Sequence, residues 1–282
     1  MLEEFPENIR IQRAYLEVLN RDGQDRYFSW EYGAGDLLPD TLKDEYEDAL
    51  ASVQYAFTLA EKINKGNPQN SDYIYFLFDA WRSSMRVQVV DVSWRPNLPS
   101  IIANLTQNEQ AYSDQELRDL VEQHPVMAVD REIGNHLFEK LSYIESQLKD
   151  IAPVEGSAFS HIQATFYSYR YRSYMLLRYR LDIQGAHTEL DKAKAMVEGF
   201  KKANPDFRNA YIEDAIVQTE RAYLYKVQMQ LTGQDHQSKI CFHLKEATSL
   251  WDYTKDRWGK IIDYERDADI TNRLIEKSLC EG

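Results

Sequence analysis

The chain has 282 residues, 43% of them hydrophobic and 28% charged, so it is long enough to bury a sizeable core as one large or two small domains. Its 11 glycines and 8 prolines are few for this length, which argues against a fold of many short strands and tight turns. The 46 acidic and 33 basic residues give a formal net charge of −13, the wrong sign for a protein whose whole surface wraps nucleic acid.

Two further features bear on the compartment of the protein. The first residues, Met1 to Pro6, are acidic and do not resemble a secretory signal, and no apolar run approaches the ~18 to 20 residues needed to cross a bilayer. Cys241 and Cys280 lack the spacing of a zinc site and are too few for a disulfide scaffold, so we expect reduced thiols. The expected location is the cytoplasm, without membrane contact.

Apolar residues recur every three or four positions along most of the chain, and this spacing predicts an all-α fold. The predicted helices cover residues 6–20, 41–64, 73–90, 113–123, 129–151, 157–183, 188–204, 208–232, 237–258 and a C-terminal segment up to 279. Glycines and prolines gather in residues 21–39 and 93–112, which we expect to be loops, the second with one short helix. The end of the segment 73–90 is rich in valine and has strand propensity, but no partner strand is evident, so we prefer a helix.

Local signals define several helix ends. Ser113 and Glu116 form a capping box that predicts a helix start. Short connectors at 184–187, 203–206 and 232–235 should fold consecutive helices into antiparallel hairpins. The break from Pro153 to Gly156 suggests a division into an N-terminal helical-hairpin subdomain, 1–152, and a C-terminal one, 153–282.

Two helix ends share a repeated pattern of one small residue, two apolar residues and a proline. The two sets are Ala56, Ala60, Ile63, Pro68 and Ala193, Val197, Phe200, Pro205. The small residue lets paired helices approach closely, and the proline starts the next hairpin. The pattern resembles the second half of a tetratricopeptide repeat, although the hairpins are longer than that unit. The resemblance implies a short α-solenoid that binds protein partners through a groove lined by the first helix of each hairpin. An irregular helical bundle is the alternative.

One predicted helix carries an unusual mixture of tyrosine and arginine. On helical geometry, Tyr167, Tyr171, Tyr174 and Arg178 form one stripe, with Arg170 beside it. Aromatic rings edged by guanidinium groups can bind a peptide carboxylate or stack a base. We therefore expect these five residues to bind a protein partner, and nucleic acid could bind only through this basic and aromatic helix. The alternative is that the tyrosines pack between hairpins and the arginines pair with acidic groups.

A second candidate site is Arg131 with His136. Their spacing resembles that of the HEPN group of helical ribonucleases, in which the resemblance would assign the two residues to phosphate binding and proton transfer. The other histidines show no metal-binding spacing, and the sequence has no phosphate-binding or nucleophile motif, so we expect neither metal nor cofactor.

These observations favour a non-enzymatic adaptor or scaffold that works within a larger complex. A metal-independent ribonuclease of the HEPN type is the first alternative. The second alternative is an acidic inhibitor or nucleic-acid mimic, because the net charge of −13 suits a basic groove on another protein.

Overall fold

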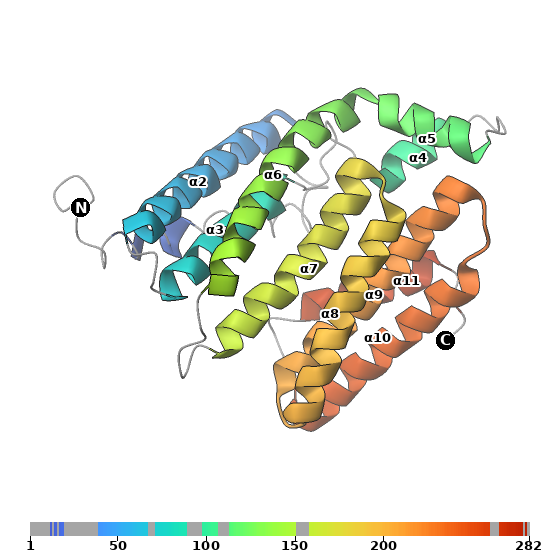
Figure 1. Cartoon of the computed structure of the whole chain (residues 1–282). Helices are drawn as coiled ribbons and strands as arrows, with labels where there is room; N and C mark the ends of the chain where they lie inside the picture. Colours follow the sequence, from blue (N-terminus) through green and yellow to red (C-terminus); the bar gives the residue numbers. More distant parts are fainter. Residues whose placement is uncertain are drawn as a thin grey trace. The chain divides into compact units, whose positions relative to one another are not determined.

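The computed structural model describes residues 12, 14–15, 17–19, 39–66, 71–88, 98–106, 113–150, 158–259, 265–278 and 280. These residues form helices joined by short connectors and contain no strand, which confirms the all-α fold (Figure 1). The helices are α2 Pro39–Gly66, α3 Ser71–Gln88, α4 Leu98–Thr106, α5 Asp114–Gln123, α6 Pro125–Asp150, α7 Ala158–Arg180, α8 Ile183–Ala203, α9 Arg208–Thr232, α10 Gln237–Trp258 and α11 Glu265–Lys277. The first predicted helix, 6–20, lies mostly outside the described residues, but those described between 12 and 19 are helical.

Several helix ends follow directly from local chemistry. Ser113 Oγ accepts a hydrogen bond from the Glu116 amide at 3.3 Å, and Glu116 Oε2 accepts one from the Ser113 amide at 2.8 Å, which confirms the predicted capping box. This bond from the Ser113 backbone lowers the pKa of Glu116. Gly233 ends α9 with φ of +63°, a conformation that glycine adopts without steric cost.

Two helices begin earlier than predicted. Helix α6 starts at Pro125 rather than at residue 129, because proline is well suited to a first helical position, where its missing N–H leaves no bond unmade. Helix α8 starts at Ile183 rather than at Thr188, because Asp182 accepts a hydrogen bond from the Gly185 amide at 2.8 Å and caps the helix. The segment predicted as a connector, 184–187, is therefore the first turn of α8.

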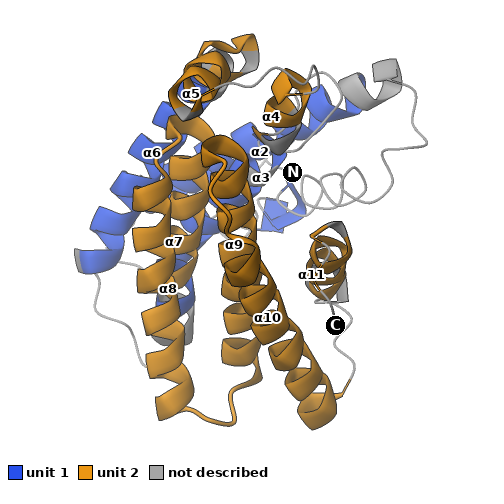
Figure 2. Ribbon diagram, turned by 90° about the vertical axis from the view of Figure 1, so that its right-hand side faces the viewer, with its two compact units in different colours: residues 1–97, 129–165 blue, residues 98–128, 166–282 orange. Residues whose placement is uncertain are grey.

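The chain divides into two compact units, each formed by separated segments. Unit 1 contains Met1–Asn97 and Val129–Thr165, and unit 2 contains Leu98–Ala128 and Phe166–Gly282 (Figure 2). Residues 98–128 thus group with the C-terminal part of the chain, unlike in the predicted division at 152. The break from Pro153 to Gly156 lies outside the described residues.

The core of unit 1 lies between α2, α3 and the part of α6 that belongs to this unit. Trp81 is buried and donates its indole N–H to Leu137 O at 3.1 Å. Lys140 pairs with Glu61 at 2.7 Å, which connects α6 to α2 at the edge of the core. The small residues Ala56 and Ala60 are fully buried, as the repeated pattern requires for close approach of helices.

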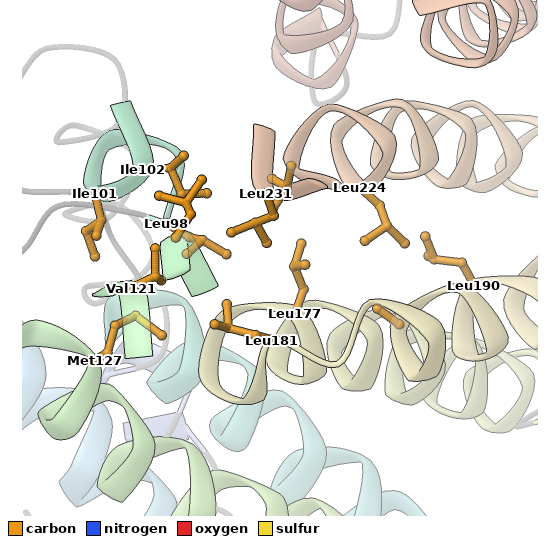
Figure 3. Packing of buried hydrophobic residues seen from close by; sticks show 13 residues of the cluster. Leu98, Ile101, Ile102, Val121, Met127, Leu177, Leu181, Leu190, Leu224 and Leu231 are labelled. Atoms are coloured by element: carbon orange, nitrogen blue, oxygen red, sulfur yellow. The ribbon is translucent and has the colours of Figure 1, made fainter. Parts of the chain in front are cut away.

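Unit 2 is organised around α9, which packs against α4, α5, α8, α10 and α11. A leucine-rich core joins α4, α5, the start of α6, the end of α7, α8 and α9; Figure 3 shows its members, which include Leu98, Ile101, Ile102, Val121, Met127, Leu177, Leu181, Leu190, Leu224 and Leu231. Ala193 and Val197 on α8 are also buried. In the part of the chain that the structure describes, no helix combines the length and the apolar character needed to span a bilayer.

Candidate functional site

The tyrosine and arginine stripe predicted from the sequence lies on the part of α7 that belongs to unit 2. Tyr167, Arg170, Tyr171 and Arg178 are each less than a tenth exposed, and Tyr174 is half-buried. Four of the five residues therefore offer no open surface to a partner while α7 stays packed. Their partner-binding role stays a prediction, and it requires α7 to separate from its neighbours.

Arg170 and its neighbours form a buried polar network between α7 and α9. Arg170 Nη2 donates to Glu220 Oε1 at 2.6 Å, its Nε lies 3.0 Å from Glu220 Oε2, and its Nη1 donates to Glu213 Oε2 at 3.3 Å. Tyr167 donates its hydroxyl to the other oxygen of Glu213 at 2.7 Å. The guanidinium also lies 5.6 Å from the centre of the Phe166 ring. All donor nitrogens of Arg170 thus face groups of the same chain.

The electrostatics of this network favour a charged guanidinium. Burial alone would lower the pKa of Arg170, but the negative charges and hydrogen bonds of Glu220, together with the charge of Glu213, outweigh it and raise that pKa. The two carboxylates stand seven positions apart on α9, so they lie on one face of this helix. The network therefore fixes α7 against α9.

Arg131 and His136, the residues of the ribonuclease hypothesis, are exposed on α6. The helix continues without a break through Gly134, and five helical positions correspond to a rotation of about 140° around the axis. The two side chains therefore leave the helix in different directions, and α6 by itself does not bring them to one phosphate group.

Three of the histidines gather around one tyrosine in unit 2. The rings of His187 on α8, His236 before α10 and His243 on α10 lie 4.7, 5.5 and 5.5 Å from the ring of Tyr225 on α9. His243 Nδ1 lies 2.7 Å from Gln218 Oε1. Burial, reinforced by the nearby Arg221, lowers the pKa of His243 to about 4. Among the described residues no group of histidine, cysteine and carboxylate side chains is arranged for a metal ion.

An exposed aromatic cluster lies where the α8–α9 connector meets the end of α10. We call it the aromatic tip; it consists of Tyr211, Tyr253, Trp258 and Arg257. The Tyr211 ring lies 5.0 Å from Tyr253 and 5.4 Å from Trp258, and the Arg257 guanidinium lies 5.0 Å from the Trp258 ring. Tyr253 is 38% exposed. The tip therefore presents aromatic surface and positive charge together.

Neighbouring groups hold the aromatic tip in place. Tyr211 donates its hydroxyl to Pro205 O at 2.9 Å, and Lys201 Nζ lies 5.1 Å from the Tyr211 ring. Arg257 forms an ion pair with Asp206 and donates to the Tyr253 hydroxyl. The hydrogen bond with this hydroxyl raises the pKa of Arg257.

The sequence interpretation did not identify the aromatic tip. Trp251 and Trp258 lie seven positions apart on α10 but have different partners. The Trp251 indole N–H donates to Thr271 Oγ1 of α11 at 3.1 Å, whereas Trp258 packs on Tyr211 and Tyr253. The available signal was the placement of Tyr211 just after one connector and of Trp258 at the end of a helix.

The two cysteines, expected to be reduced, form a disulfide bond in the structure. Cys241 lies on α10 and Cys280 follows α11, and their Cα atoms are 5.4 Å apart. Gln237 on α10 also donates to Ser278 O, so this end of the chain is attached to α10 by a covalent bond and a hydrogen bond. The expectation of two reduced thiols was wrong because 39 positions of sequence separation conceal their spatial proximity.

Comparisons of the chain with protein-family models, with curated proteins and with solved structures gave no match.

Proposed function

We propose that the chain is a non-enzymatic helical adaptor that holds an acidic segment of a partner protein against the aromatic tip. The observation that carries the proposal is the combination of exposed Tyr253, half-buried Tyr211 and Trp258, and Arg257 on one rigid hairpin end. Tyrosine, tryptophan and arginine are the residues that most often dominate binding energy in protein interfaces. Their rings are fixed before binding, which lowers the entropy lost on association.

Local charge supports an acidic partner segment. The last turns of α8 and α10 contribute four basic residues, namely Lys201, Lys202, Lys255 and Arg257. The acidic residues beside them are Asp206, which pairs with Arg257, Asp214, which pairs with Lys201, Asp252 and Asp256, so the surroundings of the tip lack the acidic excess of a chain of net charge −13. Complementary charge accelerates encounter and selects the partner.

The tetratricopeptide-like interpretation belongs to this proposal. Buried alanines at the corresponding positions, Ala56 and Ala193, support it, as do the hairpins that α8, α9 and α10 form through short connectors. The cytoplasm stays the proposed location. Reduced Cys241 and Cys280 in cell extracts would support this location, and the disulfide bond seen in the structure would count against it, because disulfides persist mainly in oxidising compartments.

The experiment places a photo-crosslinking amino acid at position 253 or, as a control, at position 242. Phe242 is 56% exposed on the same helix but lies outside the tip. The partner captured at position 253 is then purified, and its affinity is measured for wild type, Tyr253→Ala and Phe242→Ala at two salt concentrations.

We expect Tyr253→Ala to weaken binding by about 30-fold, the range of an interface hot spot, and Phe242→Ala to leave it unchanged. Binding should also weaken with added salt, because the partner segment is acidic. Equal capture at both positions, or full affinity of Tyr253→Ala, would reject the tip as the docking surface.

A further inference from the structure

A pocket of about 460 Å³ opens in unit 2 at the junction between α7 and α8. We call it the junction pocket; its lining residues are Arg118, Arg180, Leu181, Asp182, Ile183, Gln184 and Gln228. These residues come from α5, the end of α7, the start of α8 and α9, so four helices of the unit shape it. The volume lies in the range of pockets that hold small molecules.

The backbone at the junction is held by the core beneath it. Leu181 has a φ of +49°, unusual for a residue other than glycine, and its side chain is 2% exposed within the leucine-rich core (Figure 3). Its amide donates to Leu177 O at 3.2 Å, and the Asp182 amide donates to Leu176 O at 3.0 Å. The wall of the pocket is therefore a fixed turn.

The junction pocket is lined by hydrogen-bond donors. Arg118 projects from α5 and donates to Leu181 O at 3.4 Å, a long bond that leaves most of its five N–H groups for other acceptors. Arg180 is exposed at the last position of α7. Gln228 places its Oε1 3.1 Å from His187 Nε2, so the donor end of the Gln228 amide remains for the pocket.

The lining set also contains one carboxylate, that of Asp182, which caps α8 with one of its oxygens. Asp182 Oδ1 accepts the Gly185 amide at 2.8 Å as the cap of α8, and Asp182 O accepts the Ala186 amide at 3.0 Å. The pocket therefore combines two guanidinium groups, one carboxylate and an amide donor, so its lining carries one net positive charge. Such a set of donors recognises an anion, because guanidinium groups bind carboxylate or phosphoryl oxygens through paired hydrogen bonds.

We propose that the junction pocket binds a small molecule through an anionic group, phosphoryl or carboxylate, held between Arg118 and Arg180. Gln228 donates to the same group, and the leucine-rich core below the turn keeps the donors in place. This site is independent of the aromatic tip, which lies at the opposite end of α9. An experiment that rejects one of the two proposed binding sites therefore leaves the other proposal unaffected.

Binding to the full-length protein is measured by isothermal titration calorimetry at low ionic strength, with pyrophosphate as the phosphoryl probe and citrate as the carboxylate probe. The variants are Arg118→Gln, Arg180→Gln and Gln228→Glu, the last of which keeps an acceptor for His187 but adds a negative charge to the pocket. The matched control is Arg208→Gln, which removes the same charge from the exposed start of α9, about 30 Å along the helix from Gln228. Thermal unfolding without added anion verifies that each variant folds as the wild type does.

We expect at least one probe to bind the wild type, and the probe that binds identifies the group. Arg118→Gln and Arg180→Gln should each weaken binding by about tenfold or more, because each removes charge-assisted hydrogen bonds. Gln228→Glu should abolish binding, and Arg208→Gln should leave it unchanged. Absence of binding by both probes at ~10 mM, or equal weakening by Arg208→Gln, would overturn the proposal.

Discussion

Replacing Arg170 by methionine tests whether the buried network fixes α7 against α9. The substitution keeps much of the aliphatic stem and removes the guanidinium that pairs with Glu220 and Glu213. The two carboxylates then differ in their access to water, since the Glu220 side chain is 34% exposed and the Glu213 side chain is 8% exposed. Glu220 can be solvated again, whereas Glu213 stays buried and keeps the hydrogen bond from the Tyr167 hydroxyl.

The expected loss of stability follows from that difference. Removing one partner of a buried ion pair destabilises a protein by roughly 3 to 5 kcal/mol, because a charge stays buried without compensation. Since one of the two carboxylates regains water, we expect the lower end, about 3 kcal/mol. The double variant Arg170→Met, Glu213→Gln also removes the buried negative charge and keeps an acceptor for Tyr167, so it should lose only about 1.5 kcal/mol relative to wild type.

Urea unfolding at pH 7, followed by circular dichroism, gives the free energy of unfolding of each variant. Arg208→Met is the control, because it removes an exposed arginine from the start of α9 and should change stability by less than about 0.5 kcal/mol. The reasoning would be refuted by a loss below about 1 kcal/mol in Arg170→Met, or by a double variant less stable than that single variant.

Three other perturbations test separate parts of unit 2. The pKa of His243 is lowered to about 4 in the folded protein, so the unfolded state binds more protons as the pH falls from about 6.5 toward 4. The free energy of unfolding should therefore decrease over this window, by about 1 to 2 kcal/mol after allowance for the partial exposure of the ring. Urea unfolding at several pH values measures this decrease. Gly185→Ala should lose about 1 kcal/mol in the same assay, because its added methyl group would overlap the capping carboxylate of Asp182. Reduction of the disulfide between Cys241 and Cys280 should lower stability by up to about 4 kcal/mol, from the chain entropy of a loop with 39 positions of separation.

Each of these three predictions has its own control. His243→Asn keeps a nitrogen donor for Gln218 and should show a smaller dependence on pH; an unchanged dependence would assign the effect to other groups. Asp182→Ala removes the cap, so adding Gly185→Ala to it should cause little further loss, and full additivity would contradict the proposed overlap. Cys241→Ser should be insensitive to reductant, and a wild type equally insensitive would show that the bond contributes nothing to stability.

The helices of this protein are encoded locally, and the sequence predicted most of them for that reason. The capping box at Ser113, the glycine stop at Gly233 and the apolar periodicity are all contained within windows of a few turns. The same locality explains the shifted start of α8, because the capping residue is Asp182, which lies shortly before the predicted start at residue 188. Such errors shift the end of a helix by a few residues and do not change whether the helix forms.

The partners of side chains on different helices were decided only by tertiary structure. Arg170 and Glu220 are 50 positions apart, Cys241 and Cys280 are 39 apart, and Tyr211 joins Tyr253 and Trp258 from another helix. Such pairs depend on how far each helix is rotated and shifted against its neighbour, quantities that packing of the whole core determines. The sequence of α7 therefore predicted an aromatic and basic helix. Only the tertiary structure shows that most of this stripe is buried, with Arg170 facing the carboxylates of α9.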